Sequence, residues 1–599
     1  MKSVSSWVSS FVFGLFLAVL SGPFPRFADV AAFFRCLNSR TRFATVQPKM
    51  FEPSRHPTPP WWQSAVFYQI YPWSFQDSNG DGIGDLRGIQ SRLDYLRDGT
   101  TPSLGVDAIW LSPIYPSPMR DFGYDVSDYC NIDPRFGTLT DFDELLREAH
   151  RRGLRVIMDL VLNHTSDRHN WFRESRASSS SPKRQWYCWA DGKAFGCRPN
   201  NWNARFGGSS WSWDPQARQY YLHSFLKEQP DLNWQHPPVR EAMWDVVRFW
   251  LDRGVDGFRL DAINWLGKDT RWPNNPFRFG LRGYTRQHHL FDRDQAIAHE
   301  VMRELRRLVS TYPDVVLIGE AAADTPGGPA SFYGHGDDEL HLVFDFRLMK
   351  SPWRADCFRR FLSDQVPTIP KEGWPTIVFS NHDQSRHINR YGAGGDAQGR
   401  ARAAALLLLT MPGTPFVYYG EELGMRNGML RYRDLRDPYT KRFWPFRPGR
   451  DPARTPMQWD TSRCAGFTAG RPWLPVSPDY SQLNVAREAG DPHSLWSLYR
   501  RLLELRRLSP ALSLGEHQLI EGSPGECLLY QREARTDQGE KEKMLVAVNF
   551  SERACEFNLP TGSPQGRVLV STDPHFGEAL WDPRRIRLGP NEGRLVRLT

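Results

Sequence analysis

The sequence GVDGFRLDAINW, residues 254–265, holds the strongest indication of how this chain folds. Its first half is an apolar run of the kind that forms a buried strand. Successive side chains of a strand point to opposite faces, so Arg259 and Asp261 point to the same face. Two charges on one buried face are costly unless they pair. A strand that ends in a paired arginine and aspartate is therefore expected here.

Similar apolar runs recur from residue 62 onward and alternate with amphipathic segments. The segments at 141–152, 238–253, 295–311 and 400–410 have apolar residues at helical spacing. Continuous apolar strands that alternate with helices indicate a parallel sheet. Eight such units predict an α/β fold, a (β/α)8 TIM barrel, over an open doubly wound sheet, which rarely needs eight. The predicted strands are residues 66–71, 106–111, 154–161, 255–261, 315–320, 340–346, 376–381 and 414–420.

Two regions depart from this alternation. After the third strand, residues 165–236 carry loops with Trp and Gly in place of a helix, which predicts an inserted loop-rich domain. After a predicted helix at 494–508, short strands follow one another and predict a C-terminal antiparallel β domain at 512–599. The barrel is then assigned to 61–164 and 237–511, and residues 1–60 form an N-terminal extension.

The N-terminal extension contains the apolar segment WVSSFVFGLFLAVL after Lys2, which resembles the core of a signal peptide. The segment is short for a membrane span, and no clear cleavage site follows it. Met50 directly precedes the first strongly patterned sequence. We therefore expect a start near Met50, a cytoplasmic location and no stable membrane anchor. A genuine signal would instead place the protein in the periplasm or outside the cell.

The composition is ordinary for a globular protein, with 40% hydrophobic and 24% charged residues among 599. Lys and Arg exceed Asp and Glu by only 8 and form no basic block, so no nucleic-acid partner is expected. The eight cysteines lack zinc-like or CxxC spacing, and isolated thiols are favoured over a Cys188–Cys197 bridge. The 23 tryptophans could stack on sugars or anchor loops. Oligomeric state stays open.

Polar residues stand at the carboxyl ends of the predicted strands, where a barrel of this type carries its chemistry. Each one alone has a structural explanation, such as a helix N-cap, but the whole set at one rim does not. Three acids without metal-ligand spacing indicate carboxylate chemistry. The polar residues at these ends are Asp159, Asn163, His164, Arg259, Asp261, Glu320, Asn381, His382 and Asp383.

Glycoside hydrolysis needs two carboxylates in different protonation states. One attacks the anomeric carbon and must be ionised, and a neighbouring arginine lowers the pKa of such a group. Arg259 is therefore expected to keep Asp261 charged and oriented. The other carboxylate protonates the leaving oxygen and needs a raised pKa, which suits Glu320 at the end of an apolar strand.

The segments DLVLNH, GFRLDAIN, LIGE and FSNHD, in this order, resemble the four signature regions of the α-amylase family of glycoside hydrolases. The resemblance extends from about residue 62 to the C-terminus. It implies a retaining mechanism with Asp261 as nucleophile, Glu320 as acid/base, and Asp383 as a third carboxylate that binds sugar hydroxyls. The residues implied to contact the sugar are His164, His382 and Tyr124, the last by stacking.

The segment QPDLN at 229–233 resembles the fifth signature of the oligo-1,6-glucosidase and α-glucosidase group. In that group an aspartate matched to Asp125 in DFGYDV, with an arginine matched to Arg450 or to Arg454, closes the pocket beyond the non-reducing end. A closed pocket implies exo action on short substrates. A valine after the nucleophile accompanies α-1,6 preference in this group, so Ala262 points to α-1,4 bonds.

These observations predict an exo-acting retaining α-glucosidase that acts on maltose-like oligosaccharides, or on sucrose. An oligo-1,6-glucosidase and an α-glucosyl transferase on the same scaffold are the alternatives within the family. A non-catalytic homologue, like the heavy chains of amino-acid transporters, is the alternative from another class. The intact set of Asp261, Glu320 and Asp383 argues against it.

The loop DSNGDGIGD at 77–85 begins like a calcium-binding loop of the D-x-N-x-D-G type. Its twelfth position is Gly88 where an EF-hand has glutamate, so it is no EF-hand. The family resemblance implies a structural Ca²⁺ or Mg²⁺, and a plain surface turn is the alternative. No organic cofactor is expected. The implied ligands are Asp77, Asn79, Asp81, the Ile83 carbonyl and Asp85.

Overall fold

A computed structural model describes residues 59–98, 103–281, 283–322, 324–325, 327–445, 449–536, 538–577 and 579–599. The predictions made for the signal-like segment and for a start at Met50 fall outside these residues. No helix in these ranges combines the length and the apolarity that a membrane span requires.

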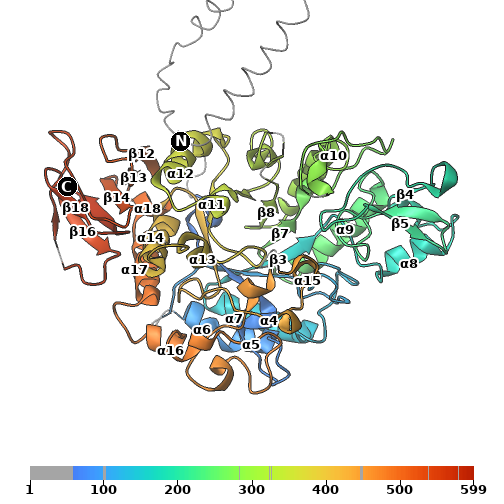
Figure 1. Cartoon of the computed structure of the whole chain (residues 1–599), viewed down its shortest axis with the longest axis horizontal. Coiled ribbons are helices and arrows are strands. Elements are labelled where there is room, and N and C mark those ends of the chain that lie inside the picture. Colours follow the sequence, from blue (N-terminus) through green and yellow to red (C-terminus); the bar gives the residue numbers. More distant parts are fainter. Residues whose placement is uncertain are drawn as a thin grey trace, which may run out of the picture. The chain divides into compact units, whose positions relative to one another are not determined.

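Eight parallel strands form the centre of the fold (Figure 1). They follow the order β10-β11-β1-β2-β3-β7-β8-β9. The ends of this order meet, because Leu342 bridges Trp374 in parallel and the Thr376 hydroxyl donates to the Val343 carbonyl. The predicted TIM barrel is confirmed, and each strand lies inside its predicted range. The strands are β1 Phe67–Ile70, β2 Ala108–Leu111, β3 Arg155–Val161, β7 Gly257–Asp261, β8 Val316–Glu320, β9 Leu342–Phe344, β10 Thr376–Val378 and β11 Thr414–Tyr418.

The inside of the barrel changes from apolar to polar along the strands. Twelve buried apolar side chains form one cluster, among them Phe67, Ile157 and Ile318. Two residues further along β1, β3 and β8, the same face carries Gln69, Asp159 and Glu320. The period of two thus points polar side chains into the barrel at its carboxyl end.

Helices surround the barrel in the alternating pattern that the sequence predicts. Thr138 and Asp141 form a reciprocal capping box at the start of α7. The main helices are α7 Leu139–Arg151, α9 Pro237–Leu251, α10 Ala296–Val309, α14 Ala397–Thr410 and α17 Leu495–Leu508. Shorter helices are α3 Trp61–Ser64, α4 Pro72–Phe75, α5 Leu86–Ser91, α6 Leu93–Leu96, α11 Arg347–Lys350, α12 Ala355–Arg360, α13 His387–Tyr391, α15 Pro438–Phe443, α16 Val485–Glu488 and α18 Pro510–Ser513.

The segment between β3 and α9 contains more regular structure than its sequence suggests. It forms α8 Asn170–Ala177 and an antiparallel sheet of β4 Trp189–Ala190, β6 Gln219–Leu222 and β5 Trp211–Asp214. Trp202 and Trp211 are buried there against Trp272 from the loop after β7. These two tryptophans therefore anchor loops and are not available to stack on a sugar. Cys188 and Cys197 are free thiols.

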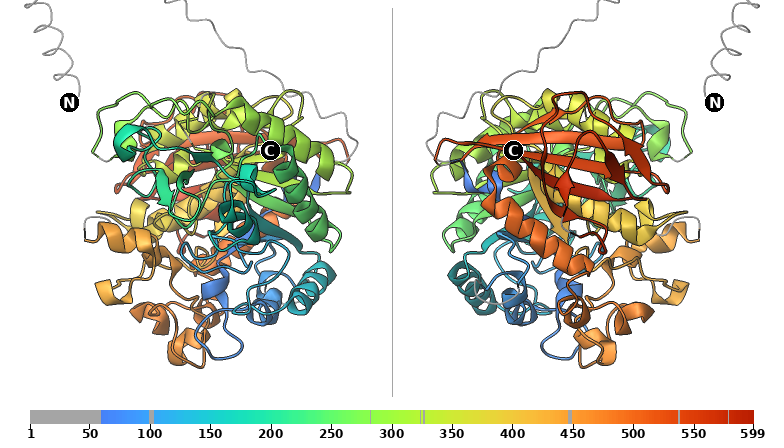
Figure 2. Two further views of the ribbon diagram at one scale, coloured as in Figure 1. Left: turned by 90° about the vertical axis from the view of Figure 1, so that its right-hand side faces the viewer. Right: turned by 90° about the vertical axis from the view of Figure 1, so that its left-hand side faces the viewer.

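The C-terminal residues form the predicted antiparallel β structure, which covers α14 and α17 (Figure 2). Tyr530 and Arg532 of β13 bond to the last turn of α14 through the Thr410 hydroxyl and carbonyl. Figure 1 shows this sheet on the opposite side of the barrel from β4 and β5. Its strands are β12 Glu516–Leu519, β13 Cys527–Arg535, β14 Lys541–Asn549, β19 Gly593–Leu598, β16 Gly566–Ser571 and β17 Leu580–Trp581, with a separate pair of β15 Cys555–Phe557 and β18 Ile586–Leu588.

Candidate active site

The three predicted catalytic acids lie together at the carboxyl end of the barrel. Asp261 is the last residue of β7, Glu320 is the last residue of β8, and Asp383 follows β10. Their side chains are 14%, 26% and 34% exposed, respectively. Arg259, by contrast, is buried beneath them. The acids can therefore reach a substrate, while the cation acts only on its protein neighbours.

Arg259 binds three carboxylates from three adjacent strands. Its Nη1 donates to Asp159 at 2.7 Å and to Asp261 at 2.9 Å, and its Nη2 contacts Glu320. The strand register explains the first contact, because it sets Asp159 of β3 beside Arg259 of β7. The ion pair expected between Arg259 and Asp261 is present, and Arg259 is shared more widely than the sequence suggested.

The protonation of Asp261 differs from the expectation. Burial raises the pKa of Asp261 to about 6, although Arg259 works in the opposite direction. The negative charge of Asp159 adds to the rise. Arg259 thus lowers the pKa of Asp261 as expected, but the net shift is upward, because one guanidinium cannot compensate for lost water and a second buried carboxylate at once.

Tyr124 and His382 form a buried chain of hydrogen bonds beside Arg259. The Tyr124 hydroxyl donates to Asp159 at 2.9 Å and lies 2.6 Å from Nε2 of His382. The Gln69 amide lies 2.7 Å from Nδ1 of His382 and, as a donor, leaves the imidazole proton on Nε2. Burial lowers the pKa of His382 to about 3, so this imidazole is neutral. The rings of Tyr124 and His382 stack with centroids 5.5 Å apart.

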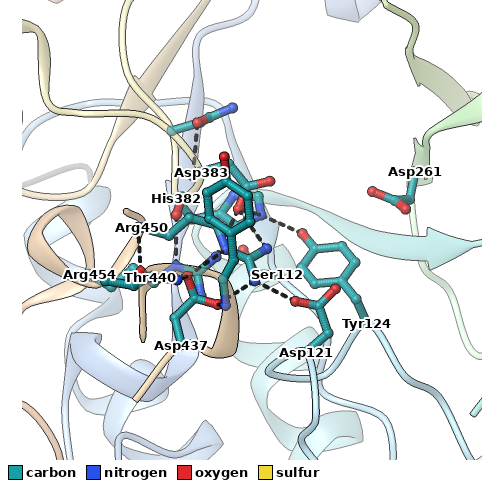
Figure 3. A network of polar contacts seen from close by, with 12 residues as sticks. Ser112, Asp121, Tyr124, Asp261, His382, Asp383, Asp437, Thr440, Arg450 and Arg454 are labelled. Carbon is teal, nitrogen blue, oxygen red and sulfur yellow. Dashed lines mark hydrogen bonds and ion pairs between the residues drawn. The ribbon is translucent and has the colours of Figure 1, made fainter. Parts of the chain in front are cut away.

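Asp383 belongs to a second cluster, built around Arg450 and Arg454 (Figure 3). Its Oδ1 accepts from Arg454 at 2.8 Å and lies 3.5 Å from Arg450. Burial alone would raise the pKa of Asp383, but His382 and the two guanidinium groups hold it well below its usual range. Asp383 is therefore ionised. Figure 3 shows Asp261 apart from this cluster, beyond Tyr124.

The partner predicted for Arg450 needs correction. Arg450 bonds to Asp121 at 2.5 Å and to Asp437 at 2.6 Å, and makes no ion pair with Asp125. Asp125 is fully buried and accepts from the Ser117 hydroxyl and from two backbone amides of its own loop. Asp125 thus braces the turn that presents Asp121. The correct aspartate begins the same DFGYDV segment, whereas no motif had indicated Asp437.

His164 and an aromatic group complete the site. Nε2 of His164 lies 3.1 Å from the Tyr124 carbonyl, and its ring centroid is 5.2 Å from that of Phe225. Phe206 packs against Phe225, and the Arg450 guanidinium lies over the Phe206 ring, with Cζ 5.4 Å from the ring centroid. The inserted segment therefore supplies two aromatic rings to the pocket. Sequence reasoning missed both phenylalanines, because no spacing distinguishes them from core residues.

The loop at 77–85 uses the oxygens of its predicted metal ligands internally. Both carboxylate oxygens of Asp77 accept two hydrogen bonds each, three from loop amides and one from Thr468. Asn79 and Asp81 each accept one backbone amide, and Asp85 caps α5. Hard oxygen ligands suit Ca²⁺, but within the described ranges no three His, Cys, Asp or Glu side chains gather as a metal site. The oxygens of Asn79 and Asp81 keep free lone pairs.

Known proteins are similar to this chain over most of its length. The family described as alpha amylase, catalytic domain, matches residues 69–515. A probable alpha-glucosidase of Rhizobium meliloti (strain 1021) is 45% identical over 85% of this chain and 92% of its own length. An oligo-1,6-glucosidase of Parageobacillus thermoglucosidasius is 39% identical over 90% of this chain and 99% of its own length.

A solved crystal structure is similar to this chain in both fold and sequence. The crystal structure of an alpha-glucosyl transfer enzyme, XgtA, superposes with a TM-score of 0.84 and 41% identity. It covers 90% of this chain and 100% of the other. Family match, relatives and fold agree with the three acids at the barrel rim: this chain belongs to the α-amylase family of glycoside hydrolases and acts on α-glucosides.

Proposed function

We propose that this enzyme is an exo-acting, retaining α-glucosidase that releases α-glucose from the non-reducing ends of short α-1,4-linked glucosides. The observation that carries the proposal is the buried cluster of Arg450 with Asp121, Asp437 and Asp383. It joins three loops beside Asp383, and we infer that it closes the site beyond the non-reducing end of the substrate. A pocket of this kind accepts only the terminal residue of a substrate.

The two acids on Arg259 would perform the chemistry in two steps. Asp261 attacks the anomeric carbon, the glycosidic C–O bond breaks, and Glu320 gives its proton to the leaving oxygen. Glu320 then takes a proton from water, which attacks the same carbon and releases Asp261. Both acids contact a single guanidinium, and this supports the short separation of a retaining pair over the wide gap of an inverting one.

The other charged groups would stabilise the sugar during these steps. Asp383 is held ionised by Arg450 and Arg454, so it can accept hydrogen bonds from sugar hydroxyls throughout the reaction. The positive charge that develops on the ring faces the carboxylates of Asp383 and Asp261, which favour it electrostatically. Neutral His382 adds no opposing positive charge.

The α-1,4 preference is proposed from Ala262. This residue directly follows the nucleophile and has a positive φ of 47°, a conformation that valine adopts only with strain. A methyl group at this point leaves room for a leaving sugar. The names of relatives supply two alternatives, an oligo-1,6-glucosidase and an alpha-glucosyl transfer enzyme. Transfer needs only an alcohol in place of water in the second step.

A substrate panel with anomer detection tests the proposal. The purified protein is assayed with maltose, isomaltose, sucrose and trehalose, and proton NMR follows the first glucose released. We expect the highest kcat/KM with maltose and α-glucose as the initial product. A preference for isomaltose would favour the α-1,6 alternative, and early β-glucose would overturn retention. Glucosylated products from added maltose in place of free glucose would favour the transferase.

We also propose that the loop at 77–85 binds a structural Ca²⁺ or Mg²⁺ through the ligands that its sequence implies, namely Asp77, Asn79, Asp81, the Ile83 carbonyl and Asp85. Among these, the oxygens of Asn79 and Asp81 keep free lone pairs. Adding Ca²⁺ to chelator-treated protein should raise the Tm through binding to the folded state. Asp81→Asn should abolish that rise, while kcat changes little. Equal Tm values with and without the ion would identify the loop as a plain turn.

A further inference from the structure

A buried lysine lies just beyond the nucleophile and has no part in the chemistry described above. Lys268 is 5% exposed, and its ammonium contacts three oxygens. Nζ lies 2.8 Å from Oδ1 of Asn163 and 3.0 Å from Oδ2 of Asp231, and it donates to the Trp265 carbonyl. An ammonium has three protons to donate, so Lys268 is fully satisfied without solvent.

The three acceptors come from three different segments that form the pocket. Asn163 follows β3, Asp231 lies in the QPDLN segment that returns from the insertion, and Trp265 lies in the first turn after Asp261. Asp231 is fully buried and also accepts from Ser224. Its carboxylate therefore needs a cation within the protein, and Lys268 is the one in contact with it.

Asn163 carries the effect of Lys268 to a residue that lines the site. Its oxygen accepts from Lys268, and this fixes its amide nitrogen toward Asp231 at 3.0 Å and toward Nδ1 of His164 at 3.1 Å. On its other side, Nε2 of His164 lies 3.1 Å from the Tyr124 carbonyl and 3.0 Å from the Gln229 amide nitrogen. Removing the ammonium would release the amide that orients His164.

Trp265 carries a second effect, toward the nucleophile. The Trp265 carbonyl accepts a hydrogen bond from Lys268. The indole ring of Trp265 packs against the rings of Phe225 and Tyr284, with centroids 5.3 Å and 5.8 Å apart. Between Asp261 and this turn lies Ala262 with its positive φ, a conformation that the surrounding structure must hold in place. The ammonium holds the end of that turn.

We propose that Lys268 is a positioning residue for glucosidase catalysis: its buried ammonium ties the turn after Asp261 to Asn163 and Asp231 and so fixes both the nucleophile and His164. The inference rests on the proposal that Asp261 is the nucleophile. A displacement of reacting groups by about 1 Å costs about 100-fold in rate. Loss of the ammonium should therefore lower kcat much more than it changes KM.

Lys268 could matter because it neutralises Asp231 or because it positions the turn after Asp261, and a double variant distinguishes the two roles. Lys268→Met removes the ammonium and leaves Asp231 unpaired, whereas Lys268→Met with Asp231→Asn leaves no buried charge. Activity on a chromogenic α-glucoside and Tm are measured for both, with assays well below the Tm of each variant. Lys183→Met, which removes an ion pair with Glu174 on the inserted segment, serves as the control and should retain the wild-type kcat.

We expect the double variant to recover much of the Tm lost in Lys268→Met while kcat stays about 100-fold below wild type. If kcat returns with the Tm, Lys268 only neutralises Asp231 and the inference is wrong. Should Lys268→Met fail to fold, the double variant alone decides by its kcat. Asp261→Asn is measured alongside, because activity retained there would overturn the nucleophile assignment and leave the Lys268 result interpretable.

Discussion

Two arginine clusters line the site and leave their carboxylates in different states. Arg259 alone faces Asp159, Asp261 and Glu320, and burial raises the pKa of both aspartates despite this cation. In the second cluster, Arg450 contacts Asp121, Asp383 and Asp437, Arg454 also contacts Asp383, and the pKa values of Asp383 and Asp437 are lowered despite burial. Burial still raises the pKa of Asp121, which contacts only Arg450 of the two arginines. The lowered pKa values therefore belong to the two carboxylates on which both guanidinium groups act.

This difference suits the two tasks. A carboxylate that binds sugar hydroxyls, as proposed for Asp383, must stay ionised, and the two neighbouring guanidinium groups secure that state. A general acid/base, the role proposed for Glu320, needs a protonation state that changes within the working pH range. The proposed nucleophile, Asp261, must be ionised when it attacks. Arg259 is shared among three carboxylates. It therefore stabilises negative charge on the cluster as a whole and does not hold that charge on one particular carboxylate.

The largest expected effect tests the Arg259 cluster. Asp261→Asn should lower kcat by on the order of 10⁴-fold or more, since it removes the group that forms the covalent intermediate. Glu320→Gln should lower kcat by about 10²- to 10⁴-fold on substrates with poor leaving groups. Turnover of maltose is measured, with circular dichroism to show that each variant is folded. Near wild-type turnover in either variant would remove that residue from the mechanism.

The next effect tests the Arg450 cluster and the corrected assignment within it. Asp121→Asn should raise KM for maltose by about 10- to 100-fold, because a charged hydrogen bond to Arg450 is lost at the closed end. Asp125→Asn is the matched control in the same loop. It should lower Tm and change KM less, because Asp125 bonds only within its own loop. A larger KM effect for Asp125→Asn would restore the original assignment.

A smaller effect concerns the residue that links β7 to its turn. Ala262→Val should shift the ratio of kcat/KM for maltose and isomaltose toward isomaltose by about tenfold, or about 1.4 kcal/mol. Valine at a positive φ should also lower the Tm, so both substrates are assayed well below it. An unchanged ratio would show that linkage preference is set elsewhere in the pocket wall.

The smallest effect is a displaced pH profile. With the pKa of Asp261 at about 6, kcat/KM should fall as the pH drops through 6, because the nucleophile becomes protonated. Asp159 raises this pKa, so Asp159→Asn should move the acid limb of the profile to lower pH. The limb is recorded with a chromogenic α-glucoside between pH 4 and 8. A limb that moves to higher pH in this variant would contradict the electrostatic account.

The strands and the first cluster were predictable from the sequence because both depend on local order. Alternating apolar runs predicted all eight strands, and the period of two placed Arg259 and Asp261 on one face before the structure was known. The second cluster joins Asp121 to Arg450, 329 positions further along the chain, and adds Asp437 from before α15. No periodicity links such loops, so the sequence indicates Asp125 as the aspartate that pairs with the arginine and gives no sign of Asp121 or Asp437. The pKa of Asp261 was mispredicted for a related reason, since the contact of Asp159 with Arg259 depends on strand pairing.

Trapping the covalent intermediate tests the central claim most directly. Wild-type enzyme is treated with a fluorinated α-glucosyl fluoride that forms the glycosyl-enzyme quickly and releases it slowly, and the digest is analysed by mass spectrometry. The account predicts one fluoroglucosyl group on the peptide that contains Asp261, and none in Asp261→Asn. An adduct on Glu320 or Asp383, or turnover of the reagent to β-configured product without any adduct, would contradict it.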